Sequence, residues 1–393
     1  MSLRVVQLHA EYSTNANSGE NSTVKNITEI LSKCFEVKSV CQSTKFITSS
    51  KRLQLRSIIE FLTTKELHEV QKADVVIFHN RIPFFGFSAI EPLLEKATVI
   101  RVWHNYRNVC IAGVEFRDNE QCNLCSTGRL KRAYGVIHKC YRNNRMASIA
   151  VTVDEERAYK SRLHPNFHQV AISRYMSMRV LNTGYPQSSV HIIPNYVEPI
   201  PVDNSISLAA EKRDFLFVGR LTEEKGVVIL LKSWSKLPRK FRREHKLHII
   251  GVGPLLKVVK EEEAKDTSIT AHGSLMPDQI GVIAQACFVG LSPAIWEEPF
   301  GKTIVEYQSM GLRQISTDKG GLSELIMPEP YGIRVKANDS EELSNAIIKI
   351  SQGVDSIELD QFHIRHWFNK NNSLEKTRND WLNLIHKLHN DKV

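Results

Sequence analysis

Short apolar runs rich in β-branched residues alternate with segments of helical periodicity along the whole chain. Such alternation is typical of βαβ units, which build parallel sheets covered by helices. The predicted strands fall into two series, residues 5–9, 74–79, 98–104, 170–173 and 191–194, then residues 215–219, 247–251, 269–273, 288–293 and 314–317. The pattern therefore predicts an α/β protein with two Rossmann-like, doubly wound parallel sheets.

The segment between the two series, residues 195–207, contains two prolines and is the predicted linker. We expect an N-terminal domain over residues 1–197 and a C-terminal domain over residues 198–365. Residues 366–393 are predicted to form a helix that crosses back toward the N-terminal domain, because large apolar side chains recur at helical spacing: Trp367, Phe368, Trp381, Leu384, Ile385 and Leu388. Two such domains facing across a cleft would bind a ligand on loops that follow strands.

The chain opens directly on a predicted strand, without the basic and apolar segments of a secretory leader. The longest apolar window, residues 280–296, is interrupted by Gln285, Ser292 and Pro293. It is therefore shorter than the roughly 18 uninterrupted apolar residues that a spanning helix needs. These features predict a cytoplasmic protein without a membrane-spanning helix.

Composition and charge narrow the choice of partner. The 393 residues are 42% hydrophobic, which excludes a disordered or fibrous protein. Residues 1–197 hold 26 Lys and Arg against 16 Asp and Glu, a net charge of +10, whereas residues 198–393 hold 26 against 27, a net charge of −1. The basic first half suggests an anionic partner: nucleic acid, a lipid surface or a phosphorylated substrate.

Four of the seven cysteines, Cys110, Cys122, Cys125 and Cys140, fall within 31 residues. Four thiolates are the ligand number of a closed tetrahedral zinc site. We predict a structural zinc ion that holds an insertion over residues 107–145, the alternative being four reduced, buried thiols. Basic residues surround the cluster and could meet an anionic acceptor or lipid: Arg129, Lys131, Arg132, Lys139, Arg142 and Arg145.

A second pattern of candidate residues follows the strand predicted at residues 288–293. Pro299 suits the first turn of a helix, and the following amides of Phe300, Gly301, Lys302 and Thr303 would then face an anion such as a diphosphate. Two acids flank this turn, Glu298 before the helix and Glu306 about two turns into it. They could hold hydroxyls at opposite ends of one nucleotide sugar. The alternative is a capped core helix with incidental acids.

Two cations follow the first strand of the second series, between Gly219 and Gly226. Arg220 can bind phosphate oxygens in a bidentate manner, and Lys225 supplies a point charge. The alternative is a solvated loop with surface charges. Glycine turns also follow later strands, at residues 272–275 and 320–324.

Together these motifs resemble the retaining glycosyltransferases of family 4, which have the GT-B fold, and the likeness runs from the first strand to the closing helix. The Glu298–Glu306 pair with seven residues between, the Gly219–Gly226 loop and the Gly320–Glu324 turn carry it. The resemblance implies four catalytic residues, His104, Glu298, Arg220 and Lys225. It assigns donor binding to Gly19, Gly219, Arg220, Lys225, Gly273, Ser274, Leu275, Glu298, Phe300, Gly301, Lys302, Thr303 and Glu306.

The resemblance also implies transfer of a sugar, with retained configuration, from a nucleotide diphosphate sugar to a glycan or polyprenyl-linked saccharide in surface polysaccharide synthesis. UDP, GDP, ADP and dTDP all remain open as the donor nucleotide. No catalytic metal is expected, because cations and a helix dipole can replace Mg²⁺ at the diphosphate.

Peripheral attachment to the anionic inner face of the cell membrane is expected from the basic first half. Apolar residues at helical spacing could add a membrane-surface helix, although such a stripe also suits a helix packed on its sheet: Leu55, Ile58, Ile59 and Leu62.

Two other functions compete with this interpretation. A nucleotide-sugar epimerase of similar shape gives no reason for the basic first half. A zinc-containing nucleic-acid-binding protein would use the cysteines and the +10 half, but it leaves unexplained why the paired cations and acids lie in the other half. We therefore expect no nucleic-acid partner.

Overall fold

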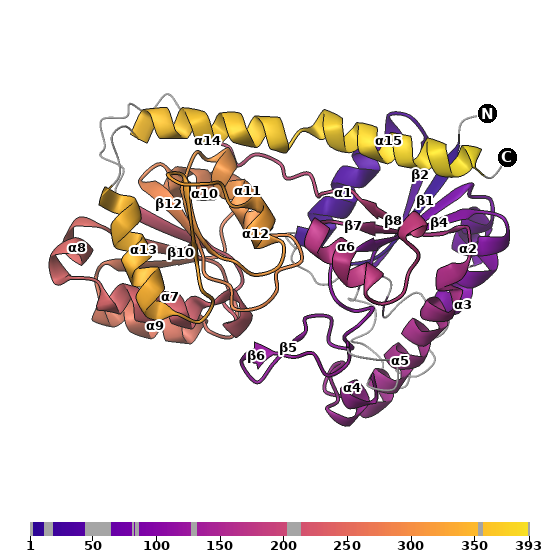
Figure 1. Cartoon of the computed structure of the whole chain (residues 1–393), viewed down its shortest axis with the longest axis horizontal. Helices are drawn as coiled ribbons and strands as arrows, with labels where there is room; N and C mark the ends of the chain where they lie inside the picture. The colour runs from indigo at the N-terminus through magenta and orange to yellow at the C-terminus, as the bar shows by residue number, and fades with distance from the viewer. Residues whose placement is uncertain are drawn as a thin grey trace. The chain divides into compact units, whose positions relative to one another are not determined.

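The computed structural model describes residues 3–11, 19–43, 64–80, 82, 86–126, 132–202, 214–352 and 357–391. The chain forms two compact units (Figure 1). The first unit comprises Met1–Glu115, Cys122–Tyr196 and Leu374–Val393, and the second comprises Phe116–Gln121 and Val197–Ser373.

Six parallel strands form the sheet of the first unit, in the order β2-β1-β3-β4-β7-β8. Their bounds are β1 Arg4–Glu11, β2 Glu36–Ser43, β3 Val75–Phe78, β4 Thr98–Trp103, β7 Phe167–Ala171 and β8 Val190–Ile192. All side chains of β3 and β4 are buried, as expected for central strands of a sheet covered on both faces.

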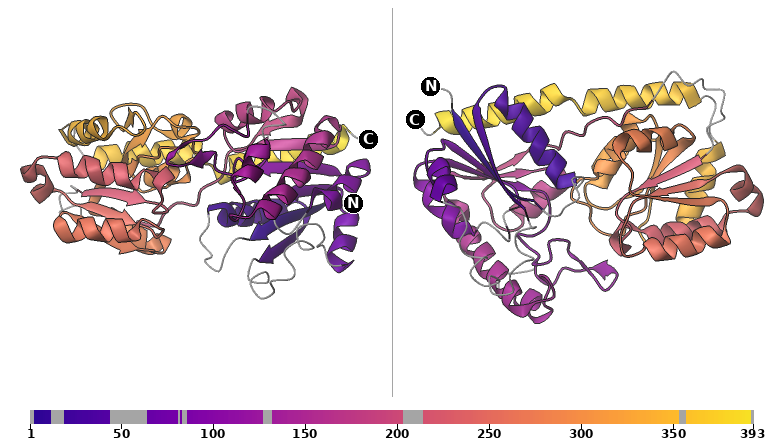
Figure 2. Two further views of the ribbon diagram at one scale, coloured as in Figure 1. Left: turned by 90° about the horizontal axis from the view of Figure 1, so that it is seen from below. Right: turned by 180° about the vertical axis from the view of Figure 1, so that it is seen from behind.

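Helices cover both faces of this sheet. Helix α1 packs against α15 and helix α3 against α5, and the views of Figure 2 show these two pairs on opposite faces. The bounds are α1 Gly19–Ser32, α2 Thr64–Gln71, α3 Phe87–Ile90, α4 Ala133–Ile137, α5 Arg145–Lys160, α6 Arg174–Leu181 and α15 Leu374–Asn390. Side-chain caps fix two of the helix starts: Asn144 Oδ1 accepts the Ala147 N–H and Ser173 Oγ accepts the Met176 N–H.

The second unit repeats the architecture with strand order β11-β10-β9-β12-β13-β14, again all parallel. The strands are β9 Asp214–Val218, β10 Leu247–Ile250, β11 Ile269–Gly273, β12 Cys287–Ser292, β13 Arg313–Thr317 and β14 Gly332–Val335. The helices are α7 Val227–Lys236, α8 Arg239–Glu244, α9 Leu256–Lys265, α10 Pro277–Ala284, α11 Lys302–Ser309, α12 Leu322–Leu325, α13 Ser340–Gln352 and α14 Ile357–Asn371. Helix α13 packs against α7, and α14 packs against α11.

The prediction of two doubly wound parallel sheets is confirmed. Sequence patterns missed the edge strands β2 and β14 and the short antiparallel pair β5 (Phe116–Arg117) and β6 (Glu120–Gln121), and they placed β7 three residues too late. The helix predicted near the C-terminus is two helices, α14 and α15. They are separated at Asn372, whose side chain accepts the Val197 N–H at 3.0 Å and donates to the Val197 carbonyl at 2.7 Å.

Both sheets contain a point where the strand order reverses. This switch point lies between β1 and β3 in the first sheet and between β9 and β12 in the second. Crossover connections leave a switch point toward opposite faces of the sheet, so a crevice opens beyond the carboxyl ends of its two strands. The two switch points are therefore the places to look for functional residues.

No helix in the described ranges has both the length and the apolar composition to cross a bilayer. The predicted stripe from Leu55 to Leu62 lies outside the described residues.

Candidate active site

Three loops meet at the switch point of the second sheet. They follow β9, β12 and β13, and backbone hydrogen bonds join them: Ile295 N–H donates to the Glu224 carbonyl at 3.0 Å, and Gly321 N–H donates to the Glu298 carbonyl at 2.6 Å. Gly226, with φ of 75°, lets the loop after β9 lie directly against the backbone of the loop after β12, because a Cβ there would lie 1.8 Å from the Pro293 carbonyl oxygen. The loops thus form one cluster.

Lys225 and Glu298 form an ion pair within this cluster. The Lys225 ammonium donates to Glu298 Oε2 at 2.6 Å, and the same oxygen accepts the Trp296 indole N–H at 2.9 Å. The ammonium also lies 5.4 Å from the centre of the Trp296 ring. Both charged side chains are largely buried, at 22% and 16% exposed. Two residues that are 73 positions apart in the sequence therefore form one polar centre.

The start of the neighbouring helix differs from the prediction. Helix α11 begins at Lys302 with Gly301 as its N-cap, so Pro299 and Phe300 precede the helix and Pro299 is not in its first turn. The reason is Gly301, whose φ of 105° breaks the helical path. A Cβ at Gly301 would also lie 2.6 Å from Leu322. The amides of Lys302 and Thr303 lie in the first turn of α11.

Glu306 lies one turn into α11 rather than two. Its carboxylate is 3.7 Å from the ammonium of Lys302. Burial raises the pKa of Glu306, while the charges of Lys302 and Lys225 act in the opposite direction. The charge of Lys225 thus acts on both acids of the predicted pair, because it contacts Glu298 directly and influences Glu306 through space.

The other predicted donor residues lie at the same end of the sheet but are less closely joined. Arg220 follows Gly219, is 64% exposed, and donates to Glu224 at 3.1 Å. The turn Gly273, Ser274 and Leu275 follows the edge strand β11, where a Cβ on Gly273 would meet no atom within 4 Å. This turn is open, whereas the Lys225–Glu298 centre is packed.

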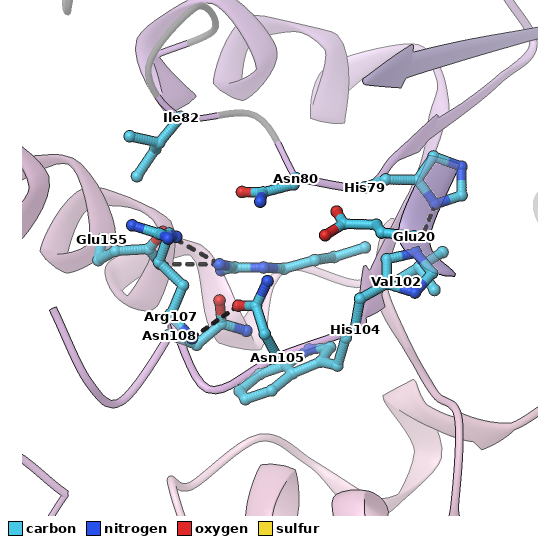
Figure 3. A pocket seen from close by; sticks show the side chains of 12 residues that line it. Glu20, His79, Asn80, Ile82, Val102, His104, Asn105, Arg107, Asn108 and Glu155 are labelled. Atoms are coloured by element: carbon cyan, nitrogen blue, oxygen red, sulfur yellow. Dashed lines mark hydrogen bonds and ion pairs between the residues drawn. The ribbon is translucent and has the colours of Figure 1, made fainter. Parts of the chain in front are cut away.

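A polar pocket occupies the switch point of the first sheet (Figure 3). It encloses about 290 Å³ of empty space, counting the part open to solvent. Its lining comes from the start of α1 and from the segments that follow β3 and β4. Figure 3 shows the side chains of Glu20, Asn80 and Asn105 turned toward the same space. The guanidinium of Arg101, another lining residue, is held by Glu155 at 2.8 Å.

His104, the histidine predicted to be catalytic, lines this pocket. Its Nε2 lies 2.9 Å from Nδ1 of His79, a residue that the sequence analysis did not select. Burial lowers the pKa of His104 to about 3, and the charge on His9 adds to the decrease. The imidazole of His104 is therefore neutral at physiological pH. Gly19, the other residue predicted in this unit, is the exposed first residue of α1.

Glu20 is a further pocket residue that sequence reasoning missed. Burial raises the pKa of its carboxyl to about 7, against the opposing charge of Arg107 and a hydrogen bond from Asn80. His9 Nδ1 lies 3.9 Å from Glu20 Oε1. The available signals were an acid in the first turn after the first strand and a histidine at the end of the strand predicted at 74–79. Neither is distinctive without the strand order.

Three of the four clustered cysteines lie close enough to interact. Burial raises the pKa of Cys125 to about 11, and the neighbouring thiols of Cys110 and Cys140 add to the rise. Burial also raises the pKa of Cys110. Within the described ranges, however, no three His, Cys, Asp or Glu side chains are arranged to hold a metal ion. The zinc site thus stays a prediction.

Comparison with known families gives a match over the second half of the chain. Residues 170–358 match the family described as Glycosyl transferases group 1. This segment contains Arg220, Lys225, Glu298 and Glu306. A curated relative, the lipopolysaccharide 1,2-N-acetylglucosaminetransferase of Salmonella typhimurium, is 25% identical over 215 residues, which cover 49% of this chain and 56% of that protein. The chain thus spans about half the length of the curated relatives it matches.

Solved structures match nearly the whole chain. Alr3699/HepE of Anabaena, in complex with UDP, superimposes with a TM-score of 0.66 at 13% identity, covering 98% of this chain and 100% of that one. Sucrose-phosphate synthase of Thermosynechococcus elongatus gives a TM-score of 0.67 at 15% identity, covering 98% and 99%. This likeness establishes the GT-B fold that the sequence motifs predict.

Proposed function

We propose that this protein is a retaining glycosyltransferase of family 4 that moves a sugar from a nucleotide diphosphate sugar to a glycan acceptor. The observation that carries the proposal is the Lys225–Glu298 pair, held beside the start of α11 at the switch point of the second sheet. The Glycosyl transferases group 1 match and the relatives that act on, or were crystallised with, nucleotides and sugars support it. In this proposal residues 198–365 bind the donor and residues 1–197 bind the acceptor.

The charges suit the departure of a diphosphate. Cleavage of the sugar–phosphate bond makes the anomeric carbon positive and the leaving diphosphate negative. Lys225, Arg220 and the amides of Lys302 and Thr303 would stabilise the negative charge, and preorganised groups of this kind contribute several kcal/mol, on the order of 3 per donor. The acceptor hydroxyl would attack from the face that the diphosphate leaves and pass its proton to the leaving phosphate oxygen.

The two acids and the open turn have distinct roles in this proposal. Glu298 would bind hydroxyls of the transferred sugar, and Glu306 would bind the ribose hydroxyls. Gly273, Ser274 and Leu275 would lie beside the base, where backbone contacts leave the choice of base open. The Lys225–Glu298 contact at 2.6 Å balances the two charges while the donor is absent. Donor binding would then give each group its own partner.

The first test is calorimetric titration with UDP, GDP, ADP and dTDP in the presence of a chelator, with a DNA oligonucleotide as the competing ligand. Binding of one nucleoside diphosphate without added metal is expected, because protein cations replace Mg²⁺. Binding of the oligonucleotide alone would exclude the proposal. Mass spectrometry of products with the matching nucleotide sugar then identifies the transferred sugar, and NMR of the product gives its anomeric configuration.

The second test removes each member of the ion pair. Lys225→Ala and Glu298→Ala should each lower kcat/KM by about 100-fold or more, because a group that stabilises the transition state is lost. Lys257→Ala is the matched control, since Lys257 is 88% exposed on α9 and far along the chain from both residues. Turnover close to that of the unmodified protein in either variant would show that the site is elsewhere.

We further propose that the acceptor is lipid-linked and that the first unit attaches to an anionic bilayer through a surface on α4 and α5. Exposed apolar side chains gather on these two neighbouring helices: Tyr134, Ile137, Met146, Ile149 and Val153. Exposed basic side chains adjoin them at Lys139, Arg142 and Arg145. Apolar insertion flanked by cations is the combination that anionic lipid surfaces bind.

Vesicle sedimentation tests this surface. Val153→Asp should reduce binding to vesicles containing phosphatidylglycerol, and binding of the unmodified protein should weaken with salt and vanish on phosphatidylcholine alone. Val282→Asp in α10 is the matched control, because Val153 and Val282 are both 63% exposed. Equal losses in the two variants, or salt-independent binding, would refute the surface.

A structural zinc ion at Cys110, Cys122, Cys125 and Cys140 is also part of the proposal. Its support is the interaction of Cys125 with both Cys110 and Cys140, since a metal would offset the cost of bringing thiolates together. Elemental analysis of freshly purified protein should give one zinc per chain. A clearly substoichiometric amount would favour four reduced thiols.

A further inference from the structure

We propose that Gln7 and His79 are positioning residues that hold His104 as the neutral tautomer with its proton on Nε2, so that Nδ1 is an acceptor in the pocket. The inference rests on the proposed function for its kinetic part, because His104 is taken as the histidine beside the transferred sugar. Its structural part concerns only hydrogen bonds within the first unit.

A continuous chain of hydrogen bonds crosses three neighbouring strands. Gln7 lies in the middle of β1, His79 follows β3 and His104 follows β4. His79 Nε2 is 2.9 Å from Gln7 Oε1, and His79 Nδ1 is 2.9 Å from His104 Nε2. Figure 3 shows the His79–His104 contact beside the pocket. Both ring nitrogens of His79 are thus engaged, one on each side.

The donor and acceptor roles in this series of hydrogen bonds are set at its far end, where Gln7 contacts Thr28. Thr28 Oγ1 donates its single proton to the Val24 carbonyl at 2.9 Å, and Ser39 Oγ, 3.1 Å away, can then donate to Thr28 Oγ1. Thr28 Oγ1 can therefore only accept from the Gln7 amide, which contacts it at 3.1 Å. The amide nitrogen of Gln7 must face Thr28, and so its oxygen faces His79. This assignment follows from the network and does not depend on observed hydrogens.

The remaining donors follow in order. Because Gln7 Oε1 can only accept, His79 must carry its proton on Nε2. A neutral His79 then has a lone pair on Nδ1, which requires the proton of His104 to lie on Nε2. Burial keeps both rings neutral, since it lowers the pKa of His79 and of His104. Gln7 is fully buried and His79 is 4% exposed, so water does not readily replace either partner.

The tautomer of His104 determines which ligand groups can bind to it. With Nε2–H committed to His79, the nitrogen of His104 that remains for a ligand is Nδ1, which presents a lone pair. A sugar hydroxyl can donate to this nitrogen, whereas a carbonyl or phosphate oxygen would meet a second lone pair and be repelled. The relay therefore favours hydroxyl-bearing ligands at His104. A histidine held in one tautomer by a third group is a known way to fix its role.

The direct test is ¹⁵N NMR of the full chain labelled at histidine, recorded near neutral pH. His104, assigned by its loss in His104→Gln, should show one protonated and one unprotonated nitrogen with well-separated shifts, and the proton should lie on Nε2. A proton on Nδ1, or on both nitrogens, of His104 in the unmodified protein would overturn the proposal.

Two substitutions at His79 add the functional readout. Gln in His79→Gln can accept from His104 and donate to Gln7, so the tautomer and the turnover should be kept. Phe in His79→Phe can do neither, so the two His104 resonances should move together through tautomer exchange. In the same variant kcat should fall by about 10- to 100-fold, with KM changed much less.

His168→Phe is the matched control. His168 and His191 also pair between neighbouring strands of the first unit, at 3.4 Å, but neither lines the pocket. Unchanged tautomer and kcat in His79→Phe, or equal losses in His79→Phe and His168→Phe, would reject the positioning role. If no nucleotide sugar is turned over by the unmodified protein, the proposed function fails, while the NMR result still decides the relay.

Discussion

Two histidine pairs, one in each unit, have nearly the same geometry. In the first unit His79 Nδ1 and His104 Nε2 are 2.9 Å apart, with ring centres 5.1 Å apart and planes 28° apart. In the second unit His248 Nδ1 and His272 Nε2 are also 2.9 Å apart, with values of 5.2 Å and 26°. Each pair joins two neighbouring parallel strands. Only the group beyond the pair differs.

That third group determines which charge the pair can carry. Nε2 of His79 meets the neutral amide of Gln7 at 2.9 Å, whereas Nε2 of His248 meets the carboxylate of Asp214 at 3.2 Å. An amide oxygen supports a neutral relay, and a carboxylate also stabilises an imidazolium. Burial lowers the pKa of both rings of the first pair and of His272 in the second. Nearly the same ring geometry is thus combined with a neutral third group in one unit and a charged one in the other.

The largest effect is expected from making the first pair resemble the second. Gln7→Glu places a carboxylate at a fully buried position, and urea unfolding at pH 8 should show a loss of about 2–4 kcal/mol. The new charge should also raise the pKa of His79, which histidine NMR titrations of the variant and of the unmodified protein would reveal.

Gln169→Glu serves as the comparison for this experiment. Gln169 is equally buried on β7 and accepts the Trp103 indole N–H at 2.9 Å, without a histidine partner. It should lose comparable stability and leave the His79–His104 titration unchanged. If Gln7→Glu behaves in the same way, the third group does not control the pair.

The next effect concerns the pH dependence of the pocket. The pKa of Glu20 is about 7 in the folded chain and near 4.5 when unfolded. Between these values the folded state binds more protons, so its stability falls as pH rises, by up to about 3 kcal/mol. Glu20→Gln should remove this fall in unfolding curves measured from pH 4.5 to pH 8.

His104 contributes to the pH dependence of stability in the opposite sense. Its folded pKa of about 3 is below the unfolded value of 6.5, so its contribution makes stability rise with pH between these values.

Glu29→Gln is the control for Glu20, since Glu29 is 58% exposed on the same helix. A pH profile of Glu20→Gln that parallels the unmodified protein would contradict the raised pKa.

The smallest effect is expected from making the second pair resemble the first. Asp214→Asn removes the charge beside His248. It keeps an oxygen that can accept the Lys246 N–H, which lies 2.8 Å from Asp214 Oδ1 in the unmodified protein. The loss in unfolding free energy, measured by urea unfolding, should be about 0.5–1 kcal/mol, because a charge-assisted hydrogen bond becomes a neutral one. An unchanged free energy of unfolding would show that the carboxylate charge plays no part.

Central strands were predictable, and two of the missed strands, β2 and β14, show why others were not. β3 and β4 are buried on both faces, so their apolar runs stand out. β2 and β14 are edge strands with polar side chains among the apolar ones, which weakens the signal. The break at Asn372 was invisible for another reason, since its cause is a contact with Val197, 175 residues away.

The residues of the candidate site also differ in whether the sequence alone could identify them. Lys225, Glu298 and Glu306 stand in short local motifs, so the sequence could select them as candidates, whereas the contact of Lys225 with Glu298 joins segments 73 residues apart. Glu20 and His79 carry no motif, because their importance comes from a raised pKa in one case and a ring partner in the other. The start of α11 was placed too early, since a proline indicates a helix start but the positive φ of Gly301 decides it.

The sequence by itself determined the two parallel sheets, the basic first half and the residue types of the donor motifs, because periodicity, charge and short motifs are properties of neighbouring positions. Only the tertiary structure decided which group ends each histidine pair and which acid is buried enough to hold its proton near neutral pH. Those properties depend on burial and on partners from separate strands, and neither is written in any short stretch of the chain.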